Sequence, residues 1–274
     1  DHGHALARGL APGPAMAELY GRVDGCAKGK GGSMHFFDRL NNMFGGHGIV
    51  GAQTPLGAGL AFATKYRDEV IDKKVNQSVT LCFLGDGALN QGSFHEALNL
   101  AGLLKLPVIY CIENNGYSMG TSIERGTTMA ENLLSKAEGY GINGYRINGM
   151  NLFDVYSGMK PIVDESREKS IPAFVEIQTY RFKGHSMSDP RKYRSNQEET
   201  EYELLDPINQ CRKELEEAHL LDETAFKEMY KNVKSEIKKA VLFAEKSPAP
   251  SVDELYKDVY MDIWTDSYGE YKGT

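Results

Sequence analysis

Residues 79–87 read VTLCFLGDG, and residues 108–117 read VIYCIENNGY. Each stretch opens with a run of apolar side chains of strand length and closes in small or polar residues typical of a turn. In an open α/β sheet the parallel strands end at one common edge, where ligands bind. The two stretches therefore predict parallel strands that bring Asp86 beside Asn114 and Asn115 at that edge.

The segment between the two strands has the length and pattern of one helix. Twenty-six residues, 88–113, separate Gly87 from Asn114, which leaves room for a helix and the second strand. Apolar or small side chains recur there at helical spacing, at Phe94, Ala97, Leu98, Ala101 and Leu104. A returning helix of this kind joins neighbouring parallel strands.

The two turns carry oxygen ligands that suit a magnesium ion bound to a diphosphate. Mg²⁺ usually takes one or two carboxylates and completes a near-octahedral shell with other oxygens, including those of ligand phosphates. Asp86 offers a carboxylate and the paired Asn residues offer amides, while Gly87 permits close approach of backbone to a phosphate. A Gly-Asp-Gly turn alone is more often structural, but the flanking strands, the helix and the paired Asn favour a site. The spacing resembles the thiamine diphosphate motif, Gly-Asp-Gly followed at about this distance by Asn-Asn.

Composition excludes several classes of function. The chain has 274 residues and a net charge of −7, which allows one large domain or two small ones. The nearest candidate for a basic cluster, residues 191–194, is short and mixed, so we expect no nucleic acid partner. Every apolar run falls short of the roughly 18 residues of a membrane helix, and the first residues do not form a signal peptide, so we expect no membrane association.

The cysteines indicate a reducing compartment. No metal-binding spacing links the four cysteines, which are Cys26, Cys82, Cys111 and Cys211. Cys82 and Cys111 lie inside the two predicted strands, so we expect both to be buried thiols.

The rest of the sequence continues the alternating pattern and ends in helices. Residues 1–53 are rich in glycine, and we expect them to be flexible unless a ligand or a neighbouring segment orders them. Further predicted elements are a helix at 54–66, a helix at 151–168, a strand at 171–178, and helices from 198 to 244 broken near 206 and 221. We expect an α/β diphosphate-binding domain over residues 1–200 and, packed on it, a helical C-terminal extension over residues 201–274.

Five segments occur in an order that resembles one family. They are residues 28–35 (KGKGGSMH), 48–53 (GIVGAQ), 85–88 (GDGA), 119–125 (MGTSIER) and 184–190 (GHSMSDP). Together they resemble the alpha subunits of pyruvate dehydrogenase, the thiamine-dependent component of 2-oxo acid dehydrogenase complexes. The resemblance runs from Asp1 to about Arg194 and is highly specific over that range, but it is weak beyond it. It implies the thiamine-diphosphate-binding α/β fold, a parallel sheet flanked by helices, with a helical C-terminal tail.

The resemblance also assigns the diphosphate half of a cofactor site. Asp86, Asn115 and the backbone carbonyl of Tyr117 match the magnesium ligands of the family. Gly87 and Ala88 match its diphosphate contacts. The cofactors implied are therefore thiamine diphosphate and Mg²⁺. In the family a Tyr-Arg pair that contacts the cofactor precedes the His-Gly with which this chain nearly begins, so we expect part of the cofactor site to be missing from this sequence.

Three further residues are assigned by the resemblance. Gly48 and Val50 match positions that lay backbone and a hydrophobic support against the aminopyrimidine, although the residues alone suggest core packing for Val50. His185 follows the predicted strand 171–178 in a loop that faces the ligand edge. A histidine there can donate to a diphosphate or a substrate carboxylate and exchange protons near neutral pH. A lone loop histidine is more often solvated, so the implied catalytic role of His185 comes from the resemblance.

The same loop raises the question of phosphorylation. In animal members of the family, serines of this loop and near Ser122 are inhibitory phosphorylation sites, and a dianion there would repel the diphosphate. Ser186 and Ser188 follow His185, but the loop is one residue shorter than the animal pattern and lacks its second serine. An enzyme without this control is equally consistent with the sequence.

A second polypeptide is implied by what the sequence lacks. No segment resembles the pyrimidine-binding module whose glutamate activates thiamine diphosphate, a cofactor that serves as an electron sink. The resemblance implies a beta subunit, an alpha2-beta2 heterotetramer, pyruvate as substrate, and transfer of the acetyl group to a lipoyl domain on the core of an acyltransferase. The compartment would be the cytoplasm of a bacterium or an organellar matrix.

Three alternatives stay open on the sequence alone. Alpha subunits of acetoin dehydrogenase and of branched-chain 2-oxo acid dehydrogenase share the Gly-Asp-Gly and Asn-Asn frame. Residues 119–125 and 185–190 favour pyruvate over the branched-chain type, but they separate pyruvate less well from acetoin. A catalytically silent regulatory subunit of the same fold would be expected to lose Asp86, Asn115 or His185, and all three are present.

Overall fold

A computed structural model describes residues 2–75 and 78–259 of the chain. The chain forms two compact units, one made of Ile49–Glu223 and the other of Asp1–Gly48 with Thr224–Thr274. This grouping differs from the division at residue 200 that the sequence suggests. The separation of residues 1–200 and 201–274 into two domains stays a prediction.

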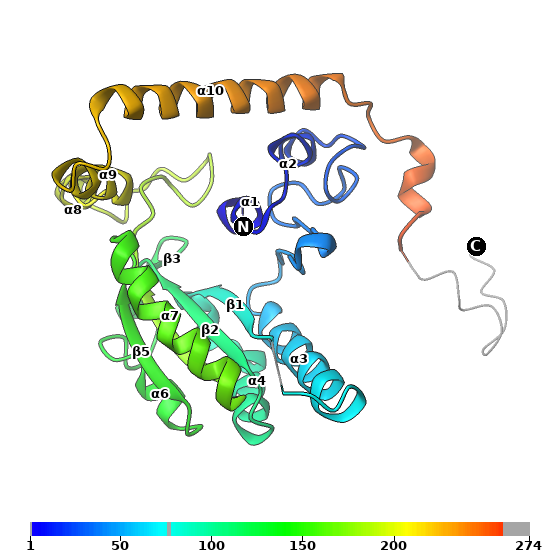
Figure 1. The fold of residues 1–274 in the computed structure, drawn as a ribbon, viewed down its shortest axis with the longest axis vertical. Helices are drawn as coiled ribbons and strands as arrows, with labels where there is room; N and C mark the ends of the chain where they lie inside the picture. The colour runs from blue at the N-terminus through cyan, green and yellow to red at the C-terminus, as the bar shows by residue number, and fades with distance from the viewer. Residues whose placement is uncertain (1, 76–77, 260–274) are drawn as a thin grey trace. The chain divides into compact units, whose positions relative to one another are not determined.

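A four-stranded parallel sheet forms the centre of the larger unit (Figure 1). The strand order is β1 (Thr80–Gly85), β2 (Val108–Asn114), β6 (Ala173–Gln178) and β5 (Asn143–Asn148). The register pairs Gly85 with Glu113 and Asn114 with Gln178. The turns that follow β1 and β2 therefore meet at one edge, and the predicted α/β fold with a parallel sheet is confirmed.

β5 is an edge strand that the sequence patterns did not predict. Of its residues, NGYRIN, only Ile147 is buried. A strand with so few apolar residues carries a weak periodic signal, because strand preference depends on packing against neighbours more than on the backbone itself. Pairing with β6 along the whole strand supplies that packing.

Helices cover both faces of the sheet, as predicted for an alternating α/β chain. They are α3 (Gln53–Tyr66), α4 (Gly92–Leu103) and α7 (Leu152–Lys169). α3 and α4 pack on one face, where the predicted apolar positions of α4 up to Ala101 are buried, while Leu104 follows the end of α4 and is exposed. α7 lies on the other face (Figure 1), where Ile162 belongs to the same cluster as Cys111. Asn151 caps α7 by accepting hydrogen bonds from two backbone N–H groups.

Two of the four cysteines lie inside the core, as predicted. Cys82 and Cys111 are buried, Cys26 and Cys211 are partly exposed, and all four are free thiols in the described part of the chain. Burial raises the pKa of the Cys82 thiol to about 12 and also raises that of Cys111. Both inner thiols are therefore protonated at neutral pH and poor nucleophiles.

Shorter elements connect the strands and continue the larger unit toward its end. They are η2 (Arg67–Ile71), η3 (Asp86–Asn90), β3 (Tyr117–Ser118), β4 (Thr121–Ser122), α5 (Ile123–Gly126), α6 (Ser135–Glu138), α8 (Asn196–Glu203) and α9 (Pro207–Glu217). β3 and β4 pair antiparallel. The predicted helix break near residue 206 is confirmed, because Asp206 caps α9 and Pro207 begins it.

The smaller unit holds the N-terminal helices and most of the longest helix. Its elements are α1 (His2–Arg8), α2 (Pro12–Leu19), η1 (Arg39–Asn41), all but the first residue of α10 (Glu223–Lys246), and η4 (Val252–Tyr256). α10 begins where the second helix break is predicted. Across the described residues, no helix combines the length and the apolar character needed to cross a membrane.

A buried carboxylate orders the glycine-rich segment of the smaller unit. Glu18 on α2 is 0% exposed. It accepts backbone hydrogen bonds of 2.7, 2.9, 2.7 and 3.0 Å from Ala27, Gly29, Gly31 and Gly32. Hydrogen bonds to an ionised acceptor are stronger than neutral ones. A neighbouring segment of the chain therefore orders this loop.

Candidate functional site

Asp86 lies just after the carboxyl end of β1, where the sequence predicts a metal ligand. The residue is 1% exposed, and its Oδ2 atom has no hydrogen-bond partner among the described residues. Burial raises the pKa of this carboxyl, against the lowering effect of nearby backbone N–H groups, including that of Asn115, and of the charge on Arg181. An unpartnered buried oxygen is costly unless a ligand such as a cation satisfies it.

A second unpartnered oxygen comes from the neighbouring turn. The Oδ1 atom of Asn115 is buried and has no hydrogen-bond partner within the described part of the chain. The backbone N–H of Asn115 interacts with the Asp86 carboxylate, so the two turns meet as predicted. Residues 2–75 and 78–259 hold no group of three or more His, Cys, Asp or Glu suited to a metal ion. A cation here would therefore draw on carboxylate, amide and backbone oxygens, which is the ligand set that Mg²⁺ prefers.

Asn114 is anchored, unlike Asn115. Its Nδ2 donates to Glu176 Oε1 over 2.8 Å, and its Oδ1 accepts from the backbone N–H of Gly116 over 3.0 Å. Glu176 is 2% exposed and accepts at Oε2 from Arg146 Nε over 2.8 Å. The amide of Asn114 is therefore hydrogen-bonded within the protein through both its nitrogen and its oxygen, whereas the amide oxygen of Asn115 is available to a ligand.

Packing around the Gly-Asp-Gly turn requires small residues. A Cβ atom added at Gly87 would lie 1.7 Å from Ser118 Oγ and 2.8 Å from Ser118 Cβ. Ala88 follows in η3 and is 3% exposed. Both predicted diphosphate contacts are therefore positions at which a larger side chain would displace its neighbours.

Tyr117 begins β3 beside the loop that carries His185. Its hydroxyl contacts both carboxylate oxygens of Glu198 at 3.1 Å, and its ring centre lies 5.2 Å from that of Tyr193. Burial, reinforced by Glu198, raises the pKa of Tyr117 to about 12. The Tyr117 side chain is hydrogen-bonded to Glu198 on α8, so the predicted ligand at this position is only the backbone carbonyl.

The two residues predicted to contact the aminopyrimidine fall in different units. Gly48 belongs to the smaller unit and Val50 to the larger one. Val50 is 59% exposed. This exposure is inconsistent with the core packing that the residue type alone suggests, and it leaves the apolar side chain accessible.

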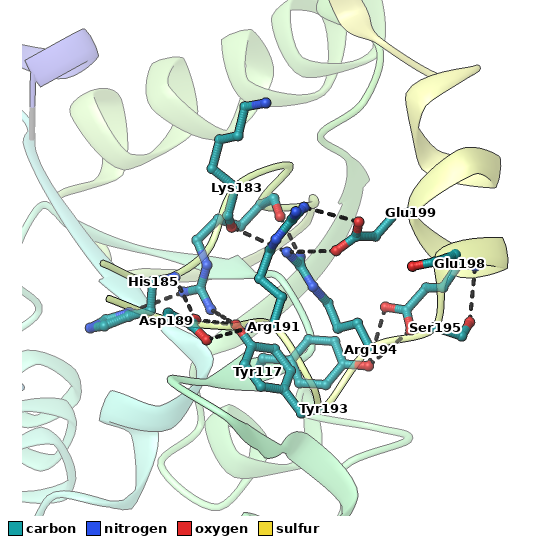
Figure 2. A network of polar contacts seen from close by, with 12 residues as sticks. Tyr117, Lys183, His185, Asp189, Arg191, Tyr193, Arg194, Ser195, Glu198 and Glu199 are labelled. Atoms are coloured by element: carbon teal, nitrogen blue, oxygen red, sulfur yellow. Dashed lines mark hydrogen bonds and ion pairs between the residues drawn. The ribbon is translucent and has the colours of Figure 1, made fainter. Parts of the chain in front are cut away.

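His185 lies on an exposed loop whose conformation depends on Asp189 (Figure 2). The Asp189 carboxylate accepts from the backbone N–H of His185 (2.7 Å) and of Arg191 (2.9 Å) and from the hydroxyl of Tyr193 (2.6 Å). These hydrogen bonds, that of Tyr193 first, hold the pKa of Asp189 down at about 2. The Nδ1 atom of His185 lies 3.1 Å from Nη1 of Arg181. Because a guanidinium can only donate, the neutral imidazole accepts at Nδ1 and carries its proton on Nε2.

Arg181 is a site residue that the sequence analysis did not single out. Its Nη2 donates to the carbonyl of Met119 over 3.1 Å and to the hydroxyl of Tyr193 over 3.2 Å. Its Nε is buried without a partner in the described residues. The charge of Arg181 acts on Asp86, and its side chain contacts His185, so it links the metal-ligand turn to the loop. Its place shortly after β6, at the ligand edge, is a signal that could have marked it.

Arg194 is a buried anchor of the same loop. Its side chain is 1% exposed, and its Nη2 lies 3.3 Å from a carboxylate oxygen of Glu199. It donates to the backbone carbonyls of Arg181 and, over 3.2 Å, of Lys183 (Figure 2). Its guanidinium carbon lies 5.0 Å from the ring centre of Tyr180, within cation–π range. No spacing in the sequence marks a residue with this role.

The serines of the loop are accessible. Ser186 and Ser188 are exposed, and their Oγ atoms lie 3.1 Å apart. Ser122 precedes α5 and is partly exposed. Accessibility alone favours neither of the two interpretations, and phosphorylation of these serines stays an open prediction.

Fold and site together define a class of protein. The edge of the parallel sheet carries carboxylate and amide oxygens that lack partners among the described residues, close packing at a glycine, and a loop with histidine and arginine. These groups suit a metal-bound, phosphorylated cofactor, so the chain is an α/β protein of the cofactor-binding type. The sequence profile of the family described as dehydrogenase E1 component matches residues 1–253, and the chain belongs to this family.

Curated relatives agree with this membership along most of the chain. The chain is 49% identical over 261 residues to the pyruvate dehydrogenase E1 component subunit alpha of Rickettsia bellii, covering 95% of this chain and 78% of that protein. It is 44% identical over 262 residues to the protein of the same name from Rhizobium meliloti, covering 95% and 73%. It is 40% identical over 262 residues to the chloroplastic subunit alpha-3 of Arabidopsis thaliana, covering 96% and 61%.

These similarities confirm the resemblance and the enzyme class inferred from the sequence. Membership of the dehydrogenase E1 family implies thiamine diphosphate as the cofactor. The oxygens of Asp86 and Asn115 that have no partner within residues 2–75 and 78–259 fit a cation bound to its diphosphate. The roles of the individual site residues stay predictions.

Proposed function

We propose that the chain is the alpha subunit of a pyruvate dehydrogenase (acetyl-transferring) and supplies the diphosphate-binding half of an active site that a beta subunit completes. The observation that carries the proposal is the pair of buried, unpartnered oxygens on Asp86 and Asn115, in the part of the chain that the structure describes. The name of the relatives at 40–49% identity supports pyruvate as the substrate and does not favour the acetoin and branched-chain alternatives.

Asp86, Asn115 and the backbone carbonyl of Tyr117 would bind Mg²⁺, and the backbone at Gly87 and Ala88 would contact the diphosphate. Two of these groups offer oxygens that are buried and lack partners among the described residues, and one divalent cation would satisfy both. A bound cation would also oppose the effect of burial on Asp86 and keep its carboxyl ionised.

His185 would donate a hydrogen bond from Nε2–H to the diphosphate or to the carboxylate of pyruvate. The contact between its Nδ1 and Arg181 supports this role, because it leaves Nε2–H as the group that faces away from the guanidinium. Arg181 would add positive charge for the anionic cofactor. Thiamine diphosphate, when bound, supplies the electron sink for loss of carbon dioxide. The residues of this chain would hold the cofactor, orient the substrate and exchange protons.

Gly48 and Val50 would lie against the aminopyrimidine ring of the cofactor. The exposure of Val50, at 59%, supports this role because an accessible apolar side chain can pack on a ligand. A hydrophobic support there would favour the bent cofactor, in which the amino group approaches the reactive carbon.

The chain would act in an alpha2-beta2 heterotetramer that acetylates a lipoyl domain on the core of an acyltransferase. The alpha-subunit name of the relatives supports a beta partner and a larger complex. Bacterial and chloroplastic relatives support a bacterial cytoplasm or an organellar matrix as the compartment. A catalytically silent subunit is not favoured, because Asp86, Asn115 and His185 are all present.

The test is an assay of the chain co-expressed with its beta subunit, with pyruvate, acetoin and a branched 2-oxo acid compared under the same conditions. Reduction of an artificial electron acceptor reports turnover. We expect turnover of pyruvate that requires both thiamine diphosphate and Mg²⁺, and none from the chain alone. Activity without a second polypeptide would contradict the shared site, and a preference for acetoin would contradict the substrate.

The metal ligand is tested by titration calorimetry of thiamine diphosphate binding in the presence of Mg²⁺. Asp86→Ala should abolish this binding, because it removes the only carboxylate of the proposed ligand set. Asp164→Ala is the matched control, since Asp164 forms an exposed ion pair with Lys160 on α7, and it should leave binding unchanged. Equal affinity in Asp86→Ala and in the unmodified assembly would show that the metal assignment is wrong.

A further inference from the structure

Glu176 is a buried carboxylate in the interior of the sheet that none of the proposed roles uses. It lies on β6, which is flanked by β2 and β5, and only 2% of the residue is exposed. A buried charge is tolerated only when it is paired and hydrogen-bonded. The partners of Glu176 therefore show what this charge does in the fold.

Each oxygen of Glu176 has a different partner. Oε2 accepts from Nε of Arg146, which lies directly opposite on β5, over 2.8 Å. Oε1 accepts from Nδ2 of Asn114 at the end of β2 over 2.8 Å. Glu176 is in register with Ile112, two residues before Asn114, so both polar side chains lie on the same face of the sheet. Arg146 supplies the compensating charge, and Asn114 is the group that the carboxylate holds.

The contact with Glu176 fixes the orientation of the Asn114 amide. A carboxylate only accepts, so Nδ2 must face it and Oδ1 must point the other way. Oδ1 accordingly accepts from the backbone N–H of Gly116 over 3.0 Å. Gly116 has a φ of 78°, a left-handed conformation that favours glycine, and its carbonyl accepts from the N–H of Ile123 over 2.9 Å. Glu176 is thus connected through one side chain to the turn between β2 and β3.

We propose that Glu176 is a positioning residue for the metal–diphosphate site, acting through Asn114 on the turn that carries Asn115 and Tyr117. The inference rests on the proposed function, which assigns Asn115 and the carbonyl of Tyr117 as ligands. Asn115 follows the anchored residue directly, and its buried Oδ1 is unpartnered among the described residues. Supporting residues of this kind orient metal ligands and affect metal affinity without touching the metal.

The experiment uses the chain assembled with its beta subunit and measures binding rather than turnover. Mn²⁺ replaces Mg²⁺ as a paramagnetic probe, and electron paramagnetic resonance gives its dissociation constant with thiamine diphosphate saturating. Glu176→Gln keeps the size of the side chain but presents an NH₂ group to either Asn114 or Arg146. We expect about 10- to 100-fold weaker metal affinity, the range typical for loss of a supporting residue.

Glu165→Gln is the matched control. Glu165 on α7 also bridges two side chains, contacting the Tyr145 hydroxyl at 3.3 Å and Lys169 at 2.9 Å, and neither partner belongs to the turn between β2 and β3. Its metal affinity should equal that of the unmodified assembly. Equal affinity in Glu176→Gln would overturn the proposal.

A double-mutant cycle separates positioning from a general loss of stability. If Glu176 acts through Asn114, Glu176→Gln should weaken binding no further in an Asn114→Ala background, whereas fully additive losses would overturn the proposal. If Glu176→Gln does not fold, Arg146→Lys takes its place, because it keeps the charge but alters the contact with Oε2. We expect a smaller loss of affinity there, and no loss would again overturn the proposal. Failure of the unmodified assembly to bind thiamine diphosphate with the metal would instead contradict the proposed function itself.

Discussion

The carboxylate of Asp189 accepts a hydrogen bond of 2.6 Å from the hydroxyl of Tyr193, and this contact closes the loop that presents His185. The surrounding donors lower the pKa of Asp189 from 3.8 to about 2. A carboxyl with a lowered pKa in the folded state stabilises that state above its unfolded pKa, and the stabilisation is lost as the pH falls through the folded one.

The order of this loop should therefore depend on pH in the acid range. We expect hydrogen-exchange protection of residues 184–193, corrected for the intrinsic rate, to be constant above about pH 5 and to fall as the pH approaches about 2. Protection of β2 measured in the same samples reports global unfolding. If protection of the loop changes in parallel with protection of β2 at every pH, the result would contradict a local role for Asp189.

Arg194→Met should destabilise the larger unit more than Arg191→Met. The Arg194 side chain is buried and donates to two partly buried backbone carbonyls, so its removal leaves these acceptors without their donor at a cost of about 1–3 kcal/mol. Arg191 pairs with the same Glu199 at 2.9 Å, but its side chain is 41% exposed, and exposed pairs contribute only about 0–1 kcal/mol. Thermal unfolding followed by circular dichroism compares them, and equal shifts in Tm would refute the anchoring role of Arg194.

Glu18→Gln should loosen the glycine-rich loop of the smaller unit. Each oxygen of Glu18 accepts from two backbone N–H groups, so the NH₂ group of the amide would face two partly buried donors and leave them unpaired. We expect a cost of about 1–3 kcal/mol for an unpaired donor. Hydrogen exchange of Gly29, Gly31 and Gly32 should become faster. Glu254→Gln is the control, because Glu254 contacts the side chain of Lys30 in the same loop, at 3.3 Å, rather than the loop backbone that Glu18 holds. Unchanged exchange in Glu18→Gln would be evidence against this anchor.

Gly87→Ala should lower Tm because the new Cβ would lie 1.7 Å from Ser118 Oγ. The clash involves the side chain of Ser118 first, so Ser118→Gly in the same chain should restore most of the lost stability. Circular dichroism melts of the two single variants and the double variant test this coupling. If the double variant is no more stable than Gly87→Ala, the source of the strain lies elsewhere.

Much of the fold is visible in local sequence patterns. The apolar runs of β1 and β2, the helical spacing from Phe94 to Ala101, and Pro207 at the start of α9 all act over a few residues, so they can be recognised without the structure. β5 and the ordering of the glycine-rich loop by Glu18 were missed, because both depend on partners distant in the sequence.

The sequence by itself determined the parallel sheet, the family, and the arrival of Asp86 and the Asn-Asn pair at one edge. Only the tertiary structure distinguished Asn114 from Asn115, since the difference arises from Glu176, which lies 62 positions away from Asn114. It also brought Arg181 close enough to act on Asp86 and to contact His185, and it buried the side chain of Arg194. The physical reason is that strand and helix preferences are local, whereas the pairing of a buried charge or amide is decided by whichever group the fold brings within about 3 Å.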